Sequence, residues 1–154
     1  MKFLLPLIAV KDIEAAKAFY KNVMGMEVTL DLGANVSLNN GALALQYDYA
    51  GLVGEIDVKI ESFSNDHELY FEEADIDGFL ERLGQFPDIR YVHRVKEYPW
   101  GQRVVRFYDP DGHIIEVGES MESVFRRFHA AGMSVEQVAE RTMHPVEFVR
   151  NFLS

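Results

Sequence analysis

The stretch YPWGQRVVRFYDPDGHIIE, residues 98–116, decides the fold. Residues 104–108 are rich in β-branched and aromatic side chains, which are typical of a strand. They are followed by Asp109-Pro110-Asp111-Gly112, where proline fixes one backbone torsion and glycine adopts conformations that other residues resist. A second apolar segment, residues 113–117, comes directly after. The pattern therefore predicts a β-hairpin.

The second strand of this hairpin carries one acidic residue in an apolar setting. Alternation along the strand puts Glu116 on the same face as Ile114, opposite His113 and Ile115. A buried carboxylate is costly unless it has a partner, which could be a cation, a hydrogen-bond donor or a metal ion. The functional question is which of these Glu116 has.

Length and composition limit the classes of function. The chain has 154 residues, of which 48% are apolar and 26% charged, as expected of a soluble domain or of two small fused modules. A net charge of −10 argues against nucleic acid as a partner. The lack of cysteine excludes thiolate catalysis and fits a cytoplasmic protein. The apolar run at residues 3–10 is too short to span a bilayer, so we read it as a strand and expect no membrane partner.

The predicted elements follow the same order twice. The first block has a strand at residues 3–10, a helix capped by Asp12, and strands at residues 27–30, 35–38 and 42–47, with a turn at Asn39-Asn40-Gly41. The second block has a strand at residues 67–72, a helix capped by Asp75, a strand at residues 90–98, and the hairpin. Residues 50–66 read as a linker with an edge strand at residues 56–60. The order is an internal repeat of two βαβββ blocks.

These two blocks, with the ending RFYDPDGHIIEV at residues 106–117 and the segment FYKNVMGMEV at residues 19–28, resemble the vicinal oxygen chelate superfamily. That superfamily contains glyoxalase I, extradiol dioxygenases and the bleomycin and fosfomycin resistance proteins. The resemblance implies an α+β fold in which two βαβββ modules form curved sheets around a cleft. It also implies a homodimer.

The resemblance carries expectations for a metal site. Family members that use a metal bind it with four side chains, two from each block. In this chain the resemblance implies His67 and Glu116 from the second block, with Glu116 as the catalytic residue, and Gln46 from the first. The fourth position falls at Leu5, which cannot bind a metal. A divalent zinc, nickel, manganese or iron ion would thus have an incomplete ligand set. The alternative is that His67 and Glu116 are hydrogen-bonded or line a ligand pocket.

Aromatic and basic side chains allow another reading of the cleft. Tyrosine and tryptophan offer large flat surfaces with a polar edge, and arginine can bind a carboxylate or phosphate. A pocket of this kind would suit a planar or aromatic molecule, including an anionic one. Arg106 shares a strand face with Val104 and Tyr108. The alternative is that the aromatic residues belong to the core or to an interface. The candidate ligand contacts are Tyr47, Tyr98, Trp100 and Arg103.

After residue 118 the pattern becomes helical. Ser120 can cap one helix, Ser134 and Gln137 form a capping box for a second, and Pro145 lies at the start of a third. We therefore predict a domain at residues 1–118, with modules at residues 1–49 and 65–118, and a helical extension at residues 119–154. The last two helices faintly resemble a helix-turn-helix, but the extension is neutral and DNA readers need a positive face.

Three hypotheses remain open on the sequence. The one we favour is a protein of the glyoxalase and bleomycin resistance type that binds a small molecule without a complete metal site. The second is a metal-dependent lyase, isomerase or dioxygenase that uses His67 and Glu116, with the metal polarising vicinal oxygens. The third is a scaffold whose helical extension binds a partner. Leu5 decides our preference for the first, and the identity of the ligand is left open.

Overall fold

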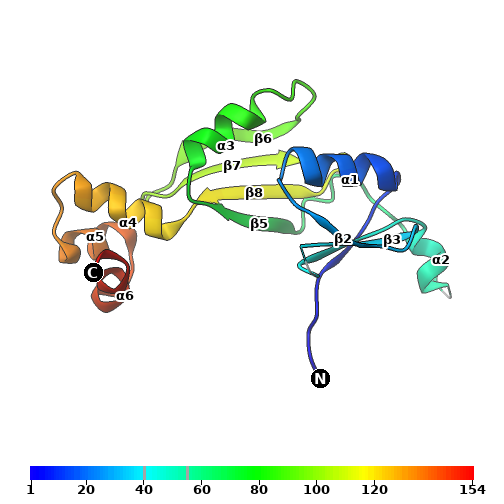
Figure 1. The fold of residues 1–154 in the computed structure, drawn as a ribbon, viewed down its shortest axis with the longest axis horizontal. Coiled ribbons are helices and arrows are strands. Elements are labelled where there is room, and N and C mark those ends of the chain that lie inside the picture. The colour runs from blue at the N-terminus through cyan, green and yellow to red at the C-terminus, as the bar shows by residue number, and fades with distance from the viewer. Residues whose placement is uncertain (40, 55) are drawn as a thin grey trace. The chain divides into compact units, whose positions relative to one another are not determined.

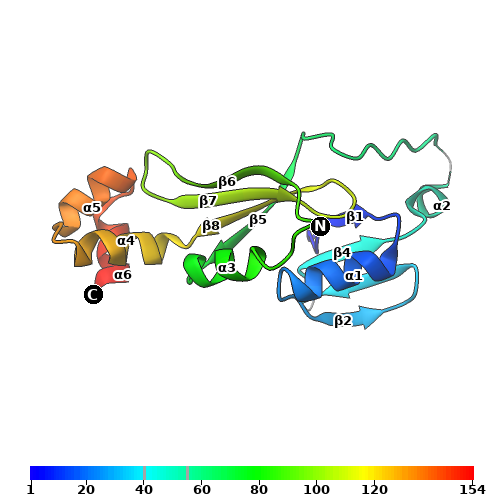
Figure 2. The same ribbon diagram turned by 90° about the horizontal axis from the view of Figure 1, so that it is seen from above.

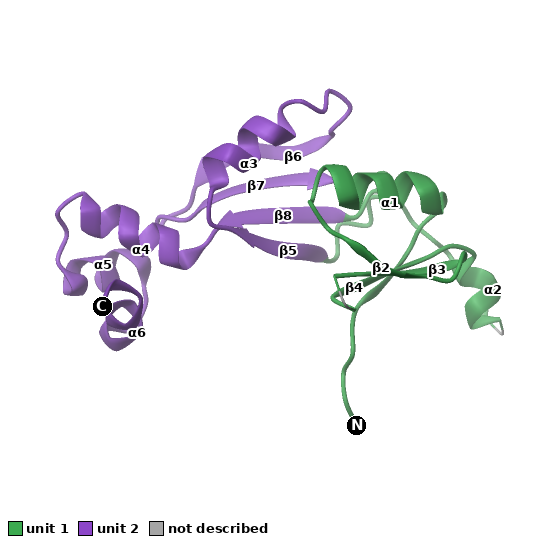
Figure 3. Cartoon of the chain, viewed as in Figure 1, with its two compact units in different colours: residues 1–67, 109–113 green, residues 68–108, 114–154 purple. Residues whose placement is uncertain are grey.

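The structure is a computed structural model that describes residues 1–39, 41–54 and 56–154. It contains two four-stranded sheets and helices (Figure 1). Two compact units can be distinguished, one of residues 1–67 and 109–113 and the other of residues 68–108 and 114–154 (Figure 3). The predicted α+β fold with two βαβββ modules is confirmed. The boundary at residue 118 stays a prediction.

Unit 1 contains the first module. Its strands are ordered β1-β4-β3-β2, with β1 parallel to β4 and the other pairs antiparallel. The Asp12 side chain accepts hydrogen bonds from the backbone of Glu14 and Ala15 and so begins α1, as predicted. Phe19 and Tyr20 of α1 are buried. The elements are β1 (Leu7–Ala9), α1 (Ile13–Asn22), β2 (Val28–Asp31), β3 (Asn35–Leu38), β4 (Leu43–Gln46) and α2 (Tyr49–Val53).

Two sequence predictions for unit 1 are corrected by the structure. The first strand is shorter than residues 3–10, because β1 begins at Leu7 while Phe3 and Leu4 are exposed. No strand forms at residues 56–60. Ile56 and Ile60 are exposed, so no buried apolar face favours pairing of this segment with a neighbouring strand. Instead, the linker begins with α2. The predicted turn at residues 39–41 includes residue 40, which lies outside the described residues.

Unit 2 repeats the module and adds three helices. Its strands are ordered β5-β8-β7-β6, again with one parallel pair, β5 with β8. The helix α3 covers one face of this sheet, where the ring of Phe79 lies 6.3 Å from that of Phe107. The elements are β5 (Glu68–Glu73), α3 (Ile76–Leu83), β6 (Tyr91–Glu97), β7 (Arg103–Tyr108), β8 (Ile114–Glu119), α4 (Met121–Ala130), α5 (Val135–Thr142) and α6 (Val146–Leu153).

The three C-terminal helices pack on one another (Figure 2). The predicted Ser120 cap and the capping box of Ser134 with Gln137 are both present. No helix in the described part of the chain is long and apolar enough to cross a membrane. The helices bury an apolar cluster of their own, which consists of Val124, Phe125, Phe128, Val138, Ala139 and Val149.

Candidate functional site

The partner of the buried carboxylate is an arginine on the neighbouring strand. Arg106 of β7 lies directly opposite Glu116 of β8, and its guanidinium forms an ion pair with the Oε2 atom of Glu116. Glu116 is 8% exposed. Its Oε2 atom has no hydrogen bond of regular geometry within the described residues, so the ion pair is what compensates for its burial.

Arg106 has further partners on the same face of the sheet. Its Nε atom donates to Glu68 over 2.9 Å, and one terminal nitrogen donates to the Tyr98 hydroxyl over 2.5 Å and lies 3.2 Å from His93 Nε2. Burial alone would lower the pKa of Arg106, but Glu68 and Tyr98 outweigh it and raise that pKa, so the arginine stays charged. We call Arg106, Glu116, Glu68, Tyr98 and His93 the Arg106 cluster.

An aromatic pair adjoins this cluster. The rings of Tyr98 and Trp100 are stacked, with centroids 4.7 Å apart, and both side chains are half-buried. The indole nitrogen of Trp100 donates to Gln102 over 3.0 Å. Gln102 in turn donates to the Tyr70 hydroxyl over 3.1 Å and to the Glu119 carbonyl over 2.9 Å. These bonds fix the orientation of the pair, so a flat apolar surface is already formed beside a charged group.

Strand alternation separates the two arginines of β7. Arg106 shares a face with Glu116, whereas Arg103 lies on the face covered by α3. There the Arg103 guanidinium donates to Glu119 over 3.1 Å and to Asp77 of α3 over 2.8 Å. Of the four predicted ligand contacts, the structure thus brings Tyr98 and Trp100 together with Glu116 and places Arg103 on the other face.

The remaining predicted residues belong to unit 1. Gln46 accepts a hydrogen bond from the Asn35 side chain over 2.9 Å and donates to the Tyr47 carbonyl. The Tyr47 side chain is exposed. His67 Nδ1 lies 2.7 Å from a carboxylate oxygen of Asp66. Gln46 and His67 each have a polar partner within their own unit, as Glu116 has within unit 2.

These contacts also test the fit of a metal ion. Within the described residues, no group of three or more histidine, cysteine, aspartate or glutamate side chains is arranged to hold one. Glu116 is already neutralised by Arg106, whose positive charge repels a cation. Leu5 offers no ligand atom. The residues present therefore do not fit a divalent metal at Glu116.

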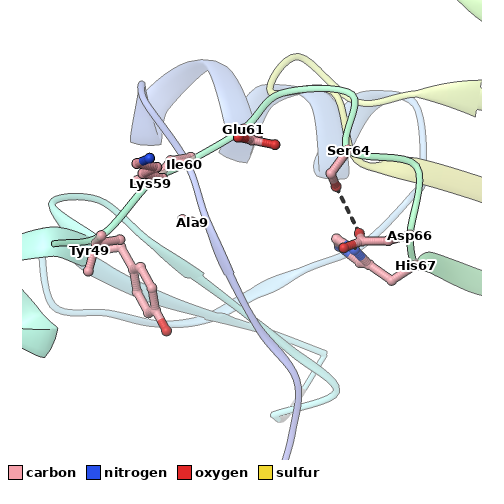
Figure 4. Close-up of a pocket in the computed structure, with 9 residues that line it drawn as sticks. Ala9, Tyr49, Lys59, Ile60, Glu61, Ser64, Asp66 and His67 are labelled. Atoms are coloured by element: carbon pink, nitrogen blue, oxygen red, sulfur yellow. Dashed lines mark hydrogen bonds and ion pairs between the residues drawn. The ribbon is translucent and has the colours of Figure 1, made fainter. Parts of the chain in front are cut away.

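Unit 1 has a depression of its own, with a volume of about 310 Å³ (Figure 4). His67 and Asp66 line one side of it, and Ser64 donates to Asp66 over 2.8 Å. The rest of the lining comes from Ala9, Tyr49, Ser64 and the linker residues 58–61. It holds one predicted site residue, His67, and no aromatic pair.

Sequence reasoning missed three residues of the candidate site, namely Glu68 and His93 beside Arg106 and Gln102 beside Trp100. Glu68 had a usable signal, because in a strand of period two it shares a face with Tyr70, which lies opposite Glu116 in the register. The prediction took His67, one residue earlier. The other two, His93 and Gln102, had no comparable signal, since an irregularity in the β6–β7 pairing and a loop bring them there.

Comparisons with known proteins agree with this architecture. The glyoxalase-like domain family matches residues 3–122, and the chain belongs to that family. A protein of unknown function from Agrobacterium tumefaciens str. C58 has 35% identity and a TM-score of 0.68, over 78% of this chain and 94% of that one. The comparison with curated proteins found no significant match.

Two further solved structures share the fold. A glyoxalase-related enzyme from Fulvimarina pelagi has 22% identity and a TM-score of 0.66, over 78% of this chain and 88% of that one. A glyoxalase/bleomycin resistance protein/dioxygenase from Nocardioides has 22% identity and a TM-score of 0.61, over 77% and 83%. Identities this low support the fold alone.

Proposed function

We propose that this glyoxalase-like protein binds a planar, aromatic small molecule against Tyr98 and Trp100, beside the Arg106 cluster, without a metal ion. The observation that carries the proposal is the stacked, half-buried aromatic pair, which hydrogen bonds hold next to a charged arginine. Binding sites for small molecules typically combine such apolar surfaces with a few oriented polar groups.

The charge of the ligand follows from the partners of Arg106. An anionic ligand would need an arginine that is not already in an ion pair. Arg106, however, pairs with Glu116 and Glu68. Arg103 is likewise engaged, by Glu119 and Asp77. An incoming anion would have to displace a carboxylate and would meet its repulsion. A cation would be repelled by Arg106 and by Lys96, whose ammonium lies 4.8 Å from the centre of the Tyr98 ring. The proposal is therefore a neutral ligand.

A set of matched bicyclic probes tests the binding. We expect isothermal titration calorimetry to detect the neutral probe 2-naphthalenemethanol, and to detect the anionic probe 2-naphthoate more weakly. Trp100→Leu should weaken binding about threefold to tenfold, because an aromatic contact contributes about 0.5–1.5 kcal/mol. Tyr47→Leu removes an exposed tyrosine of unit 1 and is the matched control. Failure of both probes to bind, or equal affinities in Trp100→Leu and wild type, would contradict the proposal.

Metal content gives a separate test. Protein purified without chelator should carry less than one equivalent of zinc, nickel, iron or manganese, because Glu116 is paired with Arg106. Inductively coupled plasma mass spectrometry measures this directly. One tightly bound ion per chain would favour the metal-dependent reaction and remove the basis for a metal-free site.

A further inference from the structure

The helices α4 and α5 contact the loop that carries Trp100. This loop, residues 98–102, joins β6 to β7 and is closed by two backbone hydrogen bonds, from Gly101 to the Tyr98 carbonyl over 2.8 Å and from Tyr98 to the Gln102 carbonyl over 2.9 Å. Its own bonds leave the carbonyls of Pro99 and Gly101, on either side of Trp100, for other donors.

Arginines from two different helices supply those donors. Arg127 of α4 donates to the Gly101 carbonyl over 2.6 Å, and Arg141 of α5 donates to the Pro99 carbonyl. Arg141 also donates to Glu97, at the end of β6, over 3.2 Å. The backbone on each side of Trp100 is thus bonded to the helical extension by a charged donor, and such bonds are stronger than neutral ones.

Packing adds to these bonds. Gly101 has a φ of +85°, and a Cβ atom at this position would lie 2.3 Å from the ring of Phe128. Phe128 belongs to the apolar cluster of the extension, and its ring also lies near the guanidinium groups of Arg127 and Arg141, at 4.7 Å and 5.4 Å. A glycine is needed here both for its backbone conformation and for the close approach of the ring.

The extension is itself anchored to the sheet. Glu119, at the end of β8, is buried and accepts hydrogen bonds from Arg103 of β7 and from Arg127 of α4. Arg127 therefore connects this anchor with the loop. The family match ends at residue 122, so nearly all of the extension lies outside the shared domain.

We infer that the C-terminal extension positions Trp100 and Tyr98 for the ligand, and that Arg141 and Arg127 are the positioning residues. The part of this inference that concerns ligand binding rests on the proposed function. The part that concerns the position of Trp100 does not depend on it. The sheet, the Arg106 cluster and the aromatic pair all lie in the domain that matches the family, residues 3–122, and the extension holds the aromatic pair in place.

The chain offers a direct probe, because Trp100 is its only tryptophan. We expect Arg141→Ala to lower the fluorescence anisotropy of Trp100, shift its emission to longer wavelength and increase acrylamide quenching, all without ligand. Affinity for 2-naphthalenemethanol should fall about threefold to tenfold, by the loss of one ordered aromatic contact. Arg141→Lys retains a cationic donor and should recover part of each effect. Circular dichroism checks that each variant is folded.

Arg126→Ala is the matched control. Arg126 lies on α4, is 59% exposed and pairs with Glu122 on its own helix, so its removal should leave the fluorescence and the affinity unchanged. Equal anisotropy and quenching in Arg141→Ala and in this control would overturn the positioning role, even if the probe binds. If the fluorescence changes as expected but wild type binds no probe, the positioning stands and the proposed function fails.

Discussion

The two sheets share a strand order and differ in the polar pair that their equivalent strands carry. In unit 1, Asn35 of β3 lies opposite Gln46 of β4, and the two neutral amides bond over 2.9 Å. In unit 2, Arg106 of β7 lies opposite Glu116 of β8, and the pair is charged. An amide pair largely satisfies itself, whereas a buried ion pair requires further partners.

This difference explains where the candidate site lies. Arg106 gathers Glu68, Tyr98 and His93 around it, while Gln46 bonds locally to Asn35 and to the adjacent Tyr47 carbonyl. With the same strand order, the sheet of unit 1 therefore carries a polar pair with only local hydrogen bonds, whereas the pair in the sheet of unit 2 belongs to a wider network. Charge, and not strand order, separates the two modules.

The largest expected effect comes from breaking the charged pair. Arg106→Met leaves Glu116 buried without a partner, and we expect it to lower the free energy of unfolding by about 3–5 kcal/mol. Urea denaturation measures the change. The double variant Arg106→Met with Glu116→Leu removes both charges and should regain much of the loss. A loss below about 1 kcal/mol in the single variant, as for an exposed ion pair, would contradict a buried pair.

A smaller effect is expected at Glu119, which joins the sheet of unit 2 to the extension. Burial alone would raise the pKa of Glu119, but hydrogen bonds from Arg103 and Arg127 outweigh it and hold that pKa below its ordinary value of 4.5. Its ionised form therefore stabilises the fold above pH 4.5, and this contribution is lost as the pH falls through the lowered value. Glu119→Gln should lower stability at pH 7 by about 1.5–3 kcal/mol.

The pH dependence separates this charge effect from a packing effect. The difference in unfolding free energy between wild type and Glu119→Gln should shrink below pH 4.5, as the pH falls through the lowered pKa at which the carboxyl of the folded wild type becomes neutral. Urea titrations at several pH values provide the profile. A difference that stays constant down to the acid range would mean that Glu119 acts through shape alone.

The smallest expected effect is in unit 1. Asn35→Ala removes a neutral amide hydrogen bond, and we expect it to cost about 1 kcal/mol in unfolding free energy. The same urea assay applies, with Ser37→Ala on the same strand as a control for strand propensity. If Asn35→Ala costs as much as Arg106→Met, the contrast between the two sheets fails.

The sequence predicted the elements well where local signals were strong. Asp12, Asp75, Ser120 and Ser134 each cap a helix as expected, because capping needs only a side-chain oxygen and the next turn of backbone. The prediction at residues 56–60 failed because alternation gives no information about whether a neighbouring strand is available.

The candidate site was only partly predictable. Glu116, Tyr98 and Trp100 could be singled out, since a charge among isoleucines and aromatic residues before a strand are visible in the sequence. The partner of Glu116 followed from cross-strand register, and register depends on the turn and on the pairing of the whole sheet. The role of Arg141 was not visible, because a contact with the Pro99 carbonyl spans 42 residues of chain.

The most direct test of the central claim compares the two sheets in one experiment. Two-dimensional ¹H–¹⁵N spectra, recorded while 2-naphthalenemethanol is added, resolve the indole N–H of Trp100, the Nε–H of Arg106 and the side-chain amides of Asn35 and Gln46. We predict that the Trp100 and Arg106 signals shift with added probe while the two amides do not. Shifts at Asn35 and Gln46, with Trp100 and Arg106 unmoved, would contradict a binding site on the second sheet.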